Sequence, residues 1–358
     1  MSWRVTAVLP FRRSAFVTGG TGSIGSPLVR LLRRRGFSVT SLGRRSVHTD
    51  DPGIRHIAGD VADRELVRRS IGGHSLVFHL AADFALGVSR RDAARMQVTN
   101  VVGTRTVLQE AWRAGAAKIV HCSSIGALGS SGPPGAVADE THPHDGRFQS
   151  VYVRTKREGH LVARELARSG APLVIALPGA AYGPGVSSIL TRQIAAIAAG
   201  RMGAAPRVSG IHSYTYVDDL VEGLCAVAEA GRIGEEYILA GPPVAFEDFC
   251  RTVAQAAGTD PPRMWISPWL LRLLSWLHDW VPGARRLLGK RPLSREEVAM
   301  IADANWAFSS GKARRELGFH ARTLAEGLPE TLQWMRATAA MAPGACAKAL
   351  PAQASNSA

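Results

Sequence analysis

Residues 14–25 read SAFVTGGTGSIG, and this stretch decides the fold. Its first five residues are mostly apolar or β-branched, which predicts a buried strand. The glycines that follow permit a tight turn, a close approach of pyrophosphate, and close packing of a helix expected from about 23 to 35. The start of that helix offers unpaired backbone N–H groups to an anion. We therefore predict a dinucleotide-binding turn whose contacts come from Gly19, Gly22, Ser23, Ile24 and Gly25.

Strand and helix patterns alternate through the first half of the chain. Short strands are expected near 38–42, 55–57, 75–80, 118–122 and 173–177, with helices near 63–71, 93–114 and 152–169. Such alternation implies parallel crossovers, so the predicted fold class is α/β, a doubly wound parallel sheet of the Rossmann type. Beyond about 180, helical stretches near 187–200, 218–230, 246–257, 268–289 and 294–302 predict a smaller, mostly helical substrate lobe.

The pattern divides the chain into four expected segments. These are an N-terminal arm (1–13), a Rossmann domain (14–180), a substrate-binding lobe interleaved with the Rossmann core (181–337) and a disordered tail (338–358). The tail is rich in alanine with serine and proline and shows no apolar period, which is typical of disorder.

The composition narrows the class of partner. The net charge of +14 is spread over many arginines and favours anionic partners such as a phosphate-bearing cofactor. There is no basic region interleaved with aromatic residues, so no nucleic-acid partner is expected. Widely separated cysteines at 122, 225, 250 and 346 predict reduced thiols and no metal site. Without a signal peptide or a membrane-spanning run, we expect a cytoplasmic protein, attached at most to a membrane surface.

The end of the second expected strand bears on which dinucleotide binds. An acidic residue there would bind the ribose hydroxyl of NAD, whereas an arginine can pair with the 2′-phosphate of NADP. Residues 43–45 are Gly-Arg-Arg, and no acid occurs before Asp50. Arg44 therefore favours NADP(H) as the cofactor, with NAD(H) as the alternative. Asp60 and Val61, after the third strand, are expected to touch the adenine ring.

A tyrosine and a lysine stand four residues apart in the expected helix over 152–169. That spacing places Tyr152 and Lys156 on one helical face. A neighbouring ammonium stabilises a phenolate, so we expect the pKa of Tyr152 to be lowered from its ordinary value near ~10. The strand before this helix ends in Ser123-Ser124, where a hydroxyl points toward the ligand crevice of such sheets.

Taken together, these motifs resemble the extended short-chain dehydrogenase/reductase family (the NAD-dependent epimerase/dehydratase superfamily) from about residue 14 to 334. Other matching segments are His79-Leu80-Ala81-Ala82, residues 100–104 (NVVGT), residues 178–184 (PGAAYGP), residues 216–220 (YVDDL) and residues 312–319 (KARRELGF).

The resemblance implies a role for each matching residue. Tyr152 would be the catalytic acid and base, and Lys156 its electrostatic partner. Ser124 is preferred to Ser123 for holding the substrate oxygen, because it lies five residues before Gly129, as the family's catalytic Ser or Thr does. Ala81 and Ala82 would line the cofactor, Pro178 would pack near the nicotinamide, and Asn100 would either anchor the site or support its helix.

Two features separate the substrate classes of the family. Nucleotide-sugar epimerases favour an acid after the second strand, and they carry an arginine five residues before the valine of the Val-Asp-Asp motif. This chain has Arg44 at the first place and His212 at the second. A neutral imidazole replaces a diphosphate-binding guanidinium poorly. The sequence therefore favours an apolar substrate over a nucleotide sugar.

Residues 264–291 carry four tryptophans among many leucines. At helical spacing Trp269, Leu273, Trp276 and Trp280 share one face. Three interpretations stay open for this segment: a buried helix of the lobe, an apolar lid over the substrate, or a helix that contacts a membrane surface.

The sequence thus predicts an NADP(H)-dependent oxidoreductase that acts on a hydrophobic (sterol-, lipid- or polyketide-like) ketone or secondary alcohol. Its character is nearest to dihydroflavonol reductase-like and 3β-hydroxysteroid dehydrogenase-like members. The alternatives are a nucleotide-sugar epimerase or dehydratase and a non-catalytic NADP(H)-binding regulatory protein. A homodimer would suit a fold of this kind.

Overall fold

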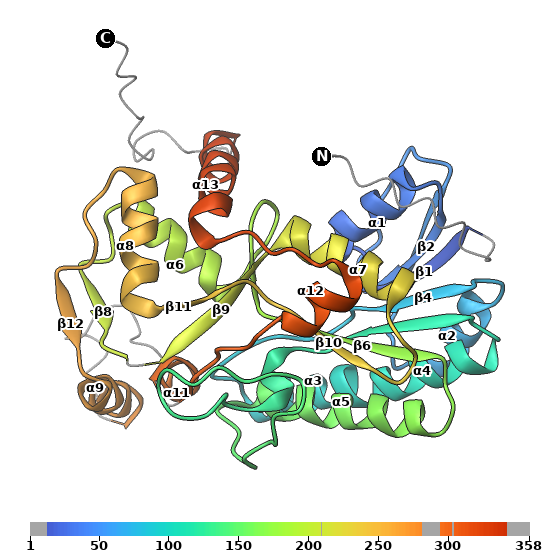
Figure 1. Ribbon diagram of the computed structural model, residues 1–358, viewed down its shortest axis with the longest axis horizontal. Helices are drawn as coiled ribbons and strands as arrows, with labels where there is room; N and C mark the ends of the chain where they lie inside the picture. The colour runs from blue at the N-terminus through green and yellow to red at the C-terminus, as the bar shows by residue number, and fades with distance from the viewer. Residues whose placement is uncertain (1–12, 209, 281–293, 303, 342–358) are drawn as a thin grey trace, which may run out of the picture.

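The centre of the molecule is a seven-stranded parallel sheet in the order β10-β6-β5-β4-β1-β2-β3 (Figure 1). The computed structural model describes residues 13–208, 210–280, 294–302 and 304–341. The strands of the sheet are β1 (Ser14–Thr18), β2 (Ser38–Gly43), β3 (Ile54–Ala58), β4 (Leu76–His79), β5 (Lys118–Cys122), β6 (Leu173–Pro178) and β10 (Glu236–Leu239). The predicted doubly wound Rossmann fold is confirmed.

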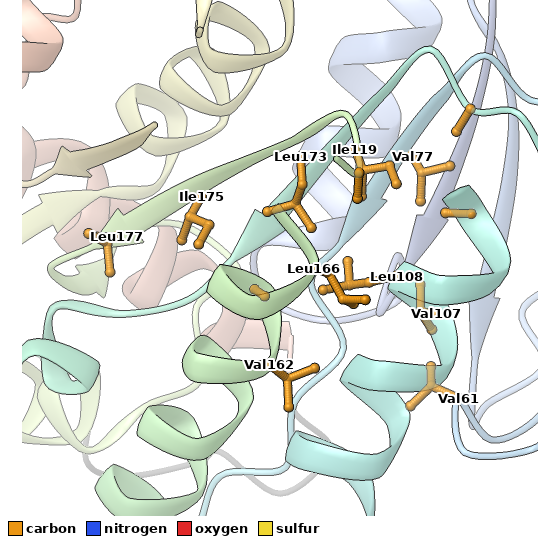
Figure 2. Close-up of a cluster of buried hydrophobic side chains, with 14 of the residues drawn as sticks. Val61, Val77, Val107, Leu108, Ile119, Val162, Leu166, Leu173, Ile175 and Leu177 are labelled. Carbon is orange, nitrogen blue, oxygen red and sulfur yellow. The ribbon is translucent and has the colours of Figure 1, made fainter. Parts of the chain in front are cut away.

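Helices cover both faces of this sheet (Figure 1). One face carries α1 (Gly25–Arg34) and α7 (Val217–Ala230), and the other carries α2 (Arg64–Ile71), α4 (Gly103–Arg113) and α5 (Val151–Arg168). Apolar residues at helical spacing, such as Val162 and Leu166 of α5, pack on strand residues such as Leu173 (Figure 2). Each face therefore has its own apolar core, and the sheet separates the two.

The predicted helix over 93–114 has three parts. It begins earlier, as α3 (Arg90–Gln97), continues as a π-helical turn over Val98–Val102, and ends as α4. A π-helical turn inserts one extra residue into a helix, and such turns occur frequently at functional sites. Here the turn contains Asn100, which is buried.

The substrate-side lobe contains strands that the sequence analysis did not predict. A three-stranded sheet joins β7 (Ala180–Tyr182), β9 (Ile211–Tyr216) and β11 (Pro243–Ala245), and β8 (Ala204–Pro206) pairs with β12 (Met264–Ile266). The helices of the lobe are α6 (Ile189–Ala198), α8 (Phe246–Ala257), α9 (Pro268–Trp280), α11 (Arg295–Ala302), α12 (Gly311–Leu317) and α13 (Leu324–Met341). β10 leaves the lobe and completes the central sheet beside β6.

The predicted N-terminal arm and C-terminal tail can be compared with the described residues only in part. Residues 338–341, expected in the tail, belong to the last turn of α13. Residues 342–358 and 1–12 lie outside the described residues. Within the described part of the chain, no helix is both long and apolar enough to span a bilayer.

His79, His121 and His160 are buried, and His212 is partly buried. His79 is fully bonded, because its Nδ1 lies 2.7 Å from Thr18 Oγ1 and its Nε2 lies 3.0 Å from Thr104 Oγ1. The ring of His121 stacks on His79 at 5.3 Å, and both nitrogens of His121 lack a partner among the described residues. Burial lowers the pKa of His79 to about 3 and that of His212 to about 4, and it holds the pKa values of His121 and His160 well below the ordinary range.

We expect acid to destabilise the fold through these rings. Below a pH of about 6.5 the unfolded chain binds protons that the folded imidazoles do not, so the free energy of unfolding falls as the pH drops. Each such histidine contributes at most about 1.4 kcal/mol per pH unit. The measurement is the free energy of unfolding, obtained from urea titrations at several pH values between neutral and mildly acidic. His121→Phe should reduce the slope of this free energy against pH by the amount that corresponds to about one proton. The exposed His320→Phe is the control, and an unchanged slope in His121→Phe would contradict the expectation.

Candidate active site

The glycine turn after β1 is held by its neighbours on both sides. The Gly19 N–H donates to Leu42 O at 2.7 Å, and a Cβ on Gly19 would lie 2.9 Å from the Ala81 nitrogen. Gly19 also has a φ of +72°, which favours glycine. A Cβ on Gly25 would lie only 2.1 Å from Gly19 O. The turn therefore packs against the ends of β2 and β4 at a spacing that excludes side chains.

The start of α1 fits a bound pyrophosphate. Its N-cap residue, Ile24, makes no side-chain cap, and no acid occurs in the first turn. By contrast, Asp63 caps α2 and Ser150 caps α5. The N–H groups at the start of α1 thus receive no side-chain acceptor, and a phosphate group is the acceptor that suits them.

The other predicted cofactor residues lie in this turn or just at the carboxyl ends of the strands, after β3 and β4 and at the end of β6. The hydroxyl of Ser23 accepts a hydrogen bond from Ser187 N at 3.1 Å, which joins the turn to the lobe. Asp60 is exposed and accepts from Ala62 N, whereas the Val61 side chain is buried in the core beside α4 (Figure 2). Only the backbone of Val61 is therefore free to meet an adenine. Ala81 donates its N–H to Thr18 Oγ1, and Pro178 ends β6.

The structure brings Ser124, Tyr152 and Lys156 together where β5 ends and α5 begins. The Ser124 hydroxyl lies close enough to the Tyr152 phenol to lower its pKa. The Lys156 ammonium is buried and donates to Cys122 O at 3.0 Å. Ser123 is turned away, because its hydroxyl lies 3.1 Å from Nδ1 of the buried His160. Of the two candidate serines, Ser124 is thus the one that contacts the tyrosine.

The expectation of a lowered tyrosine pKa is wrong for this structure. Burial raises the pKa of Tyr152, and the nearby Ser124 hydroxyl opposes this only in part. Burial also lowers the pKa of Lys156. The physical reason is that desolvation disfavours both charged forms, while the ammonium is directed at the Cys122 carbonyl. The phenol is therefore protonated at neutral pH and is a proton donor in this state.

Two residues that the sequence analysis missed border Tyr152. The ring of Phe84 meets the tyrosine ring edge-on at 4.6 Å, and 47% of Phe84 is exposed. Glu296 of α11 accepts from Gly87 N at 2.7 Å and from Val151 N at 3.0 Å. Its carboxylate thus joins the loop after β4 to the start of α5. Phe84 lies two residues after Ala82 of the Ala81-Ala82 pair and could have been found, whereas Glu296 lies in no motif.

Asn100 has a definite role in the structure. Its amide oxygen accepts from Asp83 N at 2.7 Å, and its Nδ2 donates to Asp83 O and to Thr155 Oγ1. The residue thus fixes the loop after β4 to α5, between the two sides of the site. The buried carboxylate of Asp83 pairs in turn with Arg95 at 2.8 Å and with Arg44 at 3.7 Å.

The family model described as "NAD dependent epimerase/dehydratase family" matches residues 15–240. The chain belongs to this family. It is therefore a nicotinamide-dinucleotide-dependent enzyme of the extended short-chain dehydrogenase/reductase type, and the expectation of an enzyme is confirmed.

Several named proteins are similar over nearly the whole chain. "Sterol demethylase protein B" of Methylococcus capsulatus is 31% identical over 90% of this chain and 98% of its own. A "3 beta-hydroxysteroid dehydrogenase/Delta 5-->4-isomerase" of Mycobacterium tuberculosis is 30% identical over 85% of each. The crystal structure of gox2253 is 31% identical, with a TM-score of 0.76 over 91% of this chain and 98% of its own. MoeE5 in complex with UDP-glucose and NAD is 25% identical, with a TM-score of 0.71 over 91% and 99%.

Proposed function

We propose that this enzyme is an NADP(H)-dependent oxidoreductase that acts on a hydrophobic ketone or secondary alcohol of the sterol, lipid or polyketide kind. The observation that carries the proposal is the contact of the Tyr152 phenol with Ser124, beside the exposed ring of Phe84. This arrangement offers a carbonyl oxygen two hydroxyl groups and offers the carbon skeleton an aromatic surface.

The chain's own groups would hold the oxygen and move the proton. A bound nicotinamide supplies or accepts the hydride. In the reducing direction the Ser124 hydroxyl binds the carbonyl oxygen, and the protonated Tyr152 donates its proton as negative charge develops there. Lys156 lies on the same face of α5 and offsets the phenolate that results. Proton donation needs a phenol that is protonated at rest, which agrees with the raised pKa of Tyr152.

The proposed substrate class is supported by the lack of a positive charge at His212, where a nucleotide sugar would need one to bind its diphosphate. Burial lowers the pKa of His212 to about 4, so this ring is neutral at physiological pH and cannot pair with a diphosphate. Two relatives carry sterol or hydroxysteroid in their names. Both observations favour an apolar substrate over a nucleotide sugar.

The preference for NADP(H) depends on Arg44. Its guanidinium is exposed and lies 3.7 Å from Asp83, a carboxylate that already pairs with Arg95. Because Asp83 has a second cation, Arg44 can turn to a 2′-phosphate without leaving a buried carboxylate unpaired. Arg45 contributes less, since it donates to the Thr21 carbonyl of the glycine turn.

We expect Tyr152→Phe to abolish turnover and to leave dinucleotide binding nearly intact, because the change removes only the acidic hydroxyl. The measurement is the rate of NADPH oxidation with a panel of sterol ketones, beside a fluorescence titration with NADPH. Phe84→Leu is the companion variant and should raise KM more than it lowers kcat. Full activity in Tyr152→Phe would exclude the proposed acid.

The cofactor preference has its own test. Arg44→Ser should weaken NADPH binding by about tenfold or more while changing NADH binding little, because only NADPH carries the 2′-phosphate. Arg45→Ser is the matched neighbour and should affect both cofactors alike. Equal loss for NADPH and NADH in Arg44→Ser would remove the argument for NADP(H).

We also propose that α9 contacts an anionic membrane surface. Within the described part of residues 264–291, Trp269 is 68% exposed and Trp276 is 47% exposed, so the buried-helix interpretation does not hold for this face. Trp276 and Leu273 line a groove of about 480 Å³ together with Arg272 and Arg295. Aromatic residues beside arginines are typical of helices that lie in the headgroup region. Residues 281–291 lie outside the described residues.

Vesicle sedimentation tests this contact. Wild-type protein should bind vesicles that contain phosphatidylglycerol more tightly than vesicles of phosphatidylcholine alone, and salt should weaken the binding. Replacement of both Trp269 and Trp276 by serine should abolish it. Trp112→Ser, at an exposed tryptophan of α4, is the control. Equal binding by the double variant and the control would contradict the proposal.

A further inference from the structure

A cavity of about 480 Å³ lies beside α5, away from the residues of the candidate active site. Its walls come from α5, from the loop over 140–144, and from the start of β10. Neither Ser124 nor Tyr152 nor Lys156 borders it. We call it the α5 pocket.

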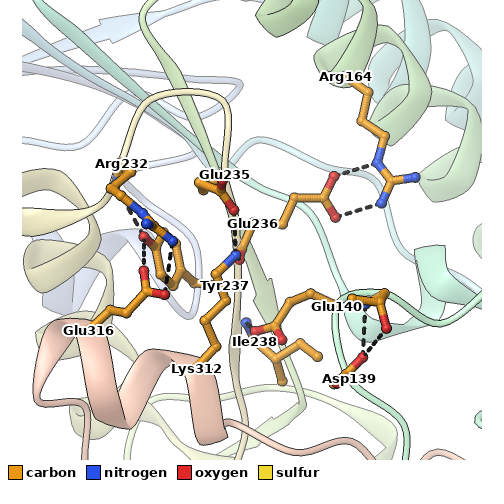
Figure 3. A network of polar contacts seen from close by, with 11 residues as sticks. Asp139, Glu140, Arg164, Arg232, Glu235, Glu236, Tyr237, Ile238, Lys312 and Glu316 are labelled. Atoms are coloured by element: carbon orange, nitrogen blue, oxygen red, sulfur yellow. Dashed lines mark hydrogen bonds and ion pairs between the residues drawn. The ribbon is translucent and has the colours of Figure 1, made fainter.

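Arginines of α5 dominate the charge of the α5 pocket. Arg157, Arg164 and Arg168 all line it. Arg164 forms a two-pronged ion pair with Glu236 and is thereby neutralised (Figure 3). Among the described residues, no carboxylate lies within ion-pair distance of Arg157 or Arg168. Arg157 and Arg168 thus have no direct ion pair among the described residues, while Glu140 and Glu236 also line the pocket.

Arg157 is in an unfavourable position without an anion. It is half-buried, and its one hydrogen bond within the described part of the chain donates to the Ala127 carbonyl at 3.1 Å. Burial and the nearby charge of Arg164 both lower the pKa of Arg157. The second acid of the pocket, Glu140, lies outside ion-pair distance of Arg157, and its carboxylate accepts from the Ile238 N–H at 2.8 Å (Figure 3). A half-buried guanidinium beside a like charge is stabilised by a bound anion.

His144 forms part of the wall of the α5 pocket beside Arg157. Its Nδ1 accepts from Gly146 N at 2.8 Å. Its Nε2 has almost no accessible surface and no partner among the described residues, so this nitrogen is enclosed by protein and does not reach a ligand in the pocket.

We propose that the α5 pocket binds a small organic anion, with a phosphate or carboxylate group held by Arg157. Arg168 lies eleven residues further along α5, about 16 Å along the helix axis, and on nearly the same face. It therefore attracts a second anionic group at the far end of the pocket. The ligand class is an elongated molecule with at least two negative charges, which binds apart from the dinucleotide.

Isothermal titration of the full chain tests this site. The protein is first saturated with NAD, so that the glycine turn is occupied, and is then titrated with inorganic pyrophosphate and, separately, with citrate. We expect one binding event with at least one probe. Tighter binding of pyrophosphate would assign a phosphate ligand, and tighter binding of citrate would assign a carboxylate ligand.

Variants decide whether that event belongs to the α5 pocket. Arg157→Gln should weaken it by about tenfold or more. Arg154→Gln is the matched control, because Arg154 is exposed on the same helix and does not line the pocket. Arg168→Gln changes an exposed residue, so it should fold and should also weaken binding, even if Arg157→Gln does not fold. No binding of either probe, or equal binding by Arg154→Gln and the pocket variants, would overturn the proposal.

Discussion

The closeness of the Gly25 backbone to the Gly19 carbonyl is the constraint on which the rest of the structure depends. A side chain at either position would collide with neighbouring backbone, so the turn can pack directly on the ends of β2 and β4. That packing fixes the start of α1 over the sheet and leaves its N–H groups without a cap. It also sets the position of Ala81, and hence the course of the loop that carries Asp83 and Phe84 past the active site.

Behind this loop, desolvation shifts the pKa values of the titratable side chains more than the attraction between neighbouring charges does. The tyrosine, the lysine and the buried histidines are all shifted toward their neutral forms. The lysine keeps its ammonium close to the site by donating to the Cys122 carbonyl. The hydroxyl of Ser123, between Cys122 and Ser124, hydrogen bonds with Nδ1 of His160. Nε2 of His160 lies 3.5 Å from a carboxylate oxygen of Glu236. The strand end that carries Ser124 is therefore supported from behind by a line of polar side chains.

Local patterns in the sequence predicted those parts of the fold and site that depend on short spacings. The glycine turn and the position of Tyr152 and Lys156 on one helical face are of this kind. Glu296 could not be found this way, because its two backbone partners are 209 and 145 residues distant. The pKa of Tyr152 was misjudged because a spacing of four residues shows which groups are neighbours, whereas burial depends on the whole fold. β10 was missed because it lies beyond residue 180, where helical stretches dominate the sequence pattern.

The late position of β10 bears on how the chain folds during its synthesis. β6 is buried along its whole length, and its outer edge pairs with β10 alone in the central sheet. The ribosome makes β7, α6, β9 and α7 before residues 236–239 become available. Throughout that interval the nascent sheet presents an open apolar edge, which is the kind of surface that chaperones bind and that promotes aggregation. The dinucleotide-binding half is thus no autonomous unit, and it reaches its final form only after part of the lobe has been made.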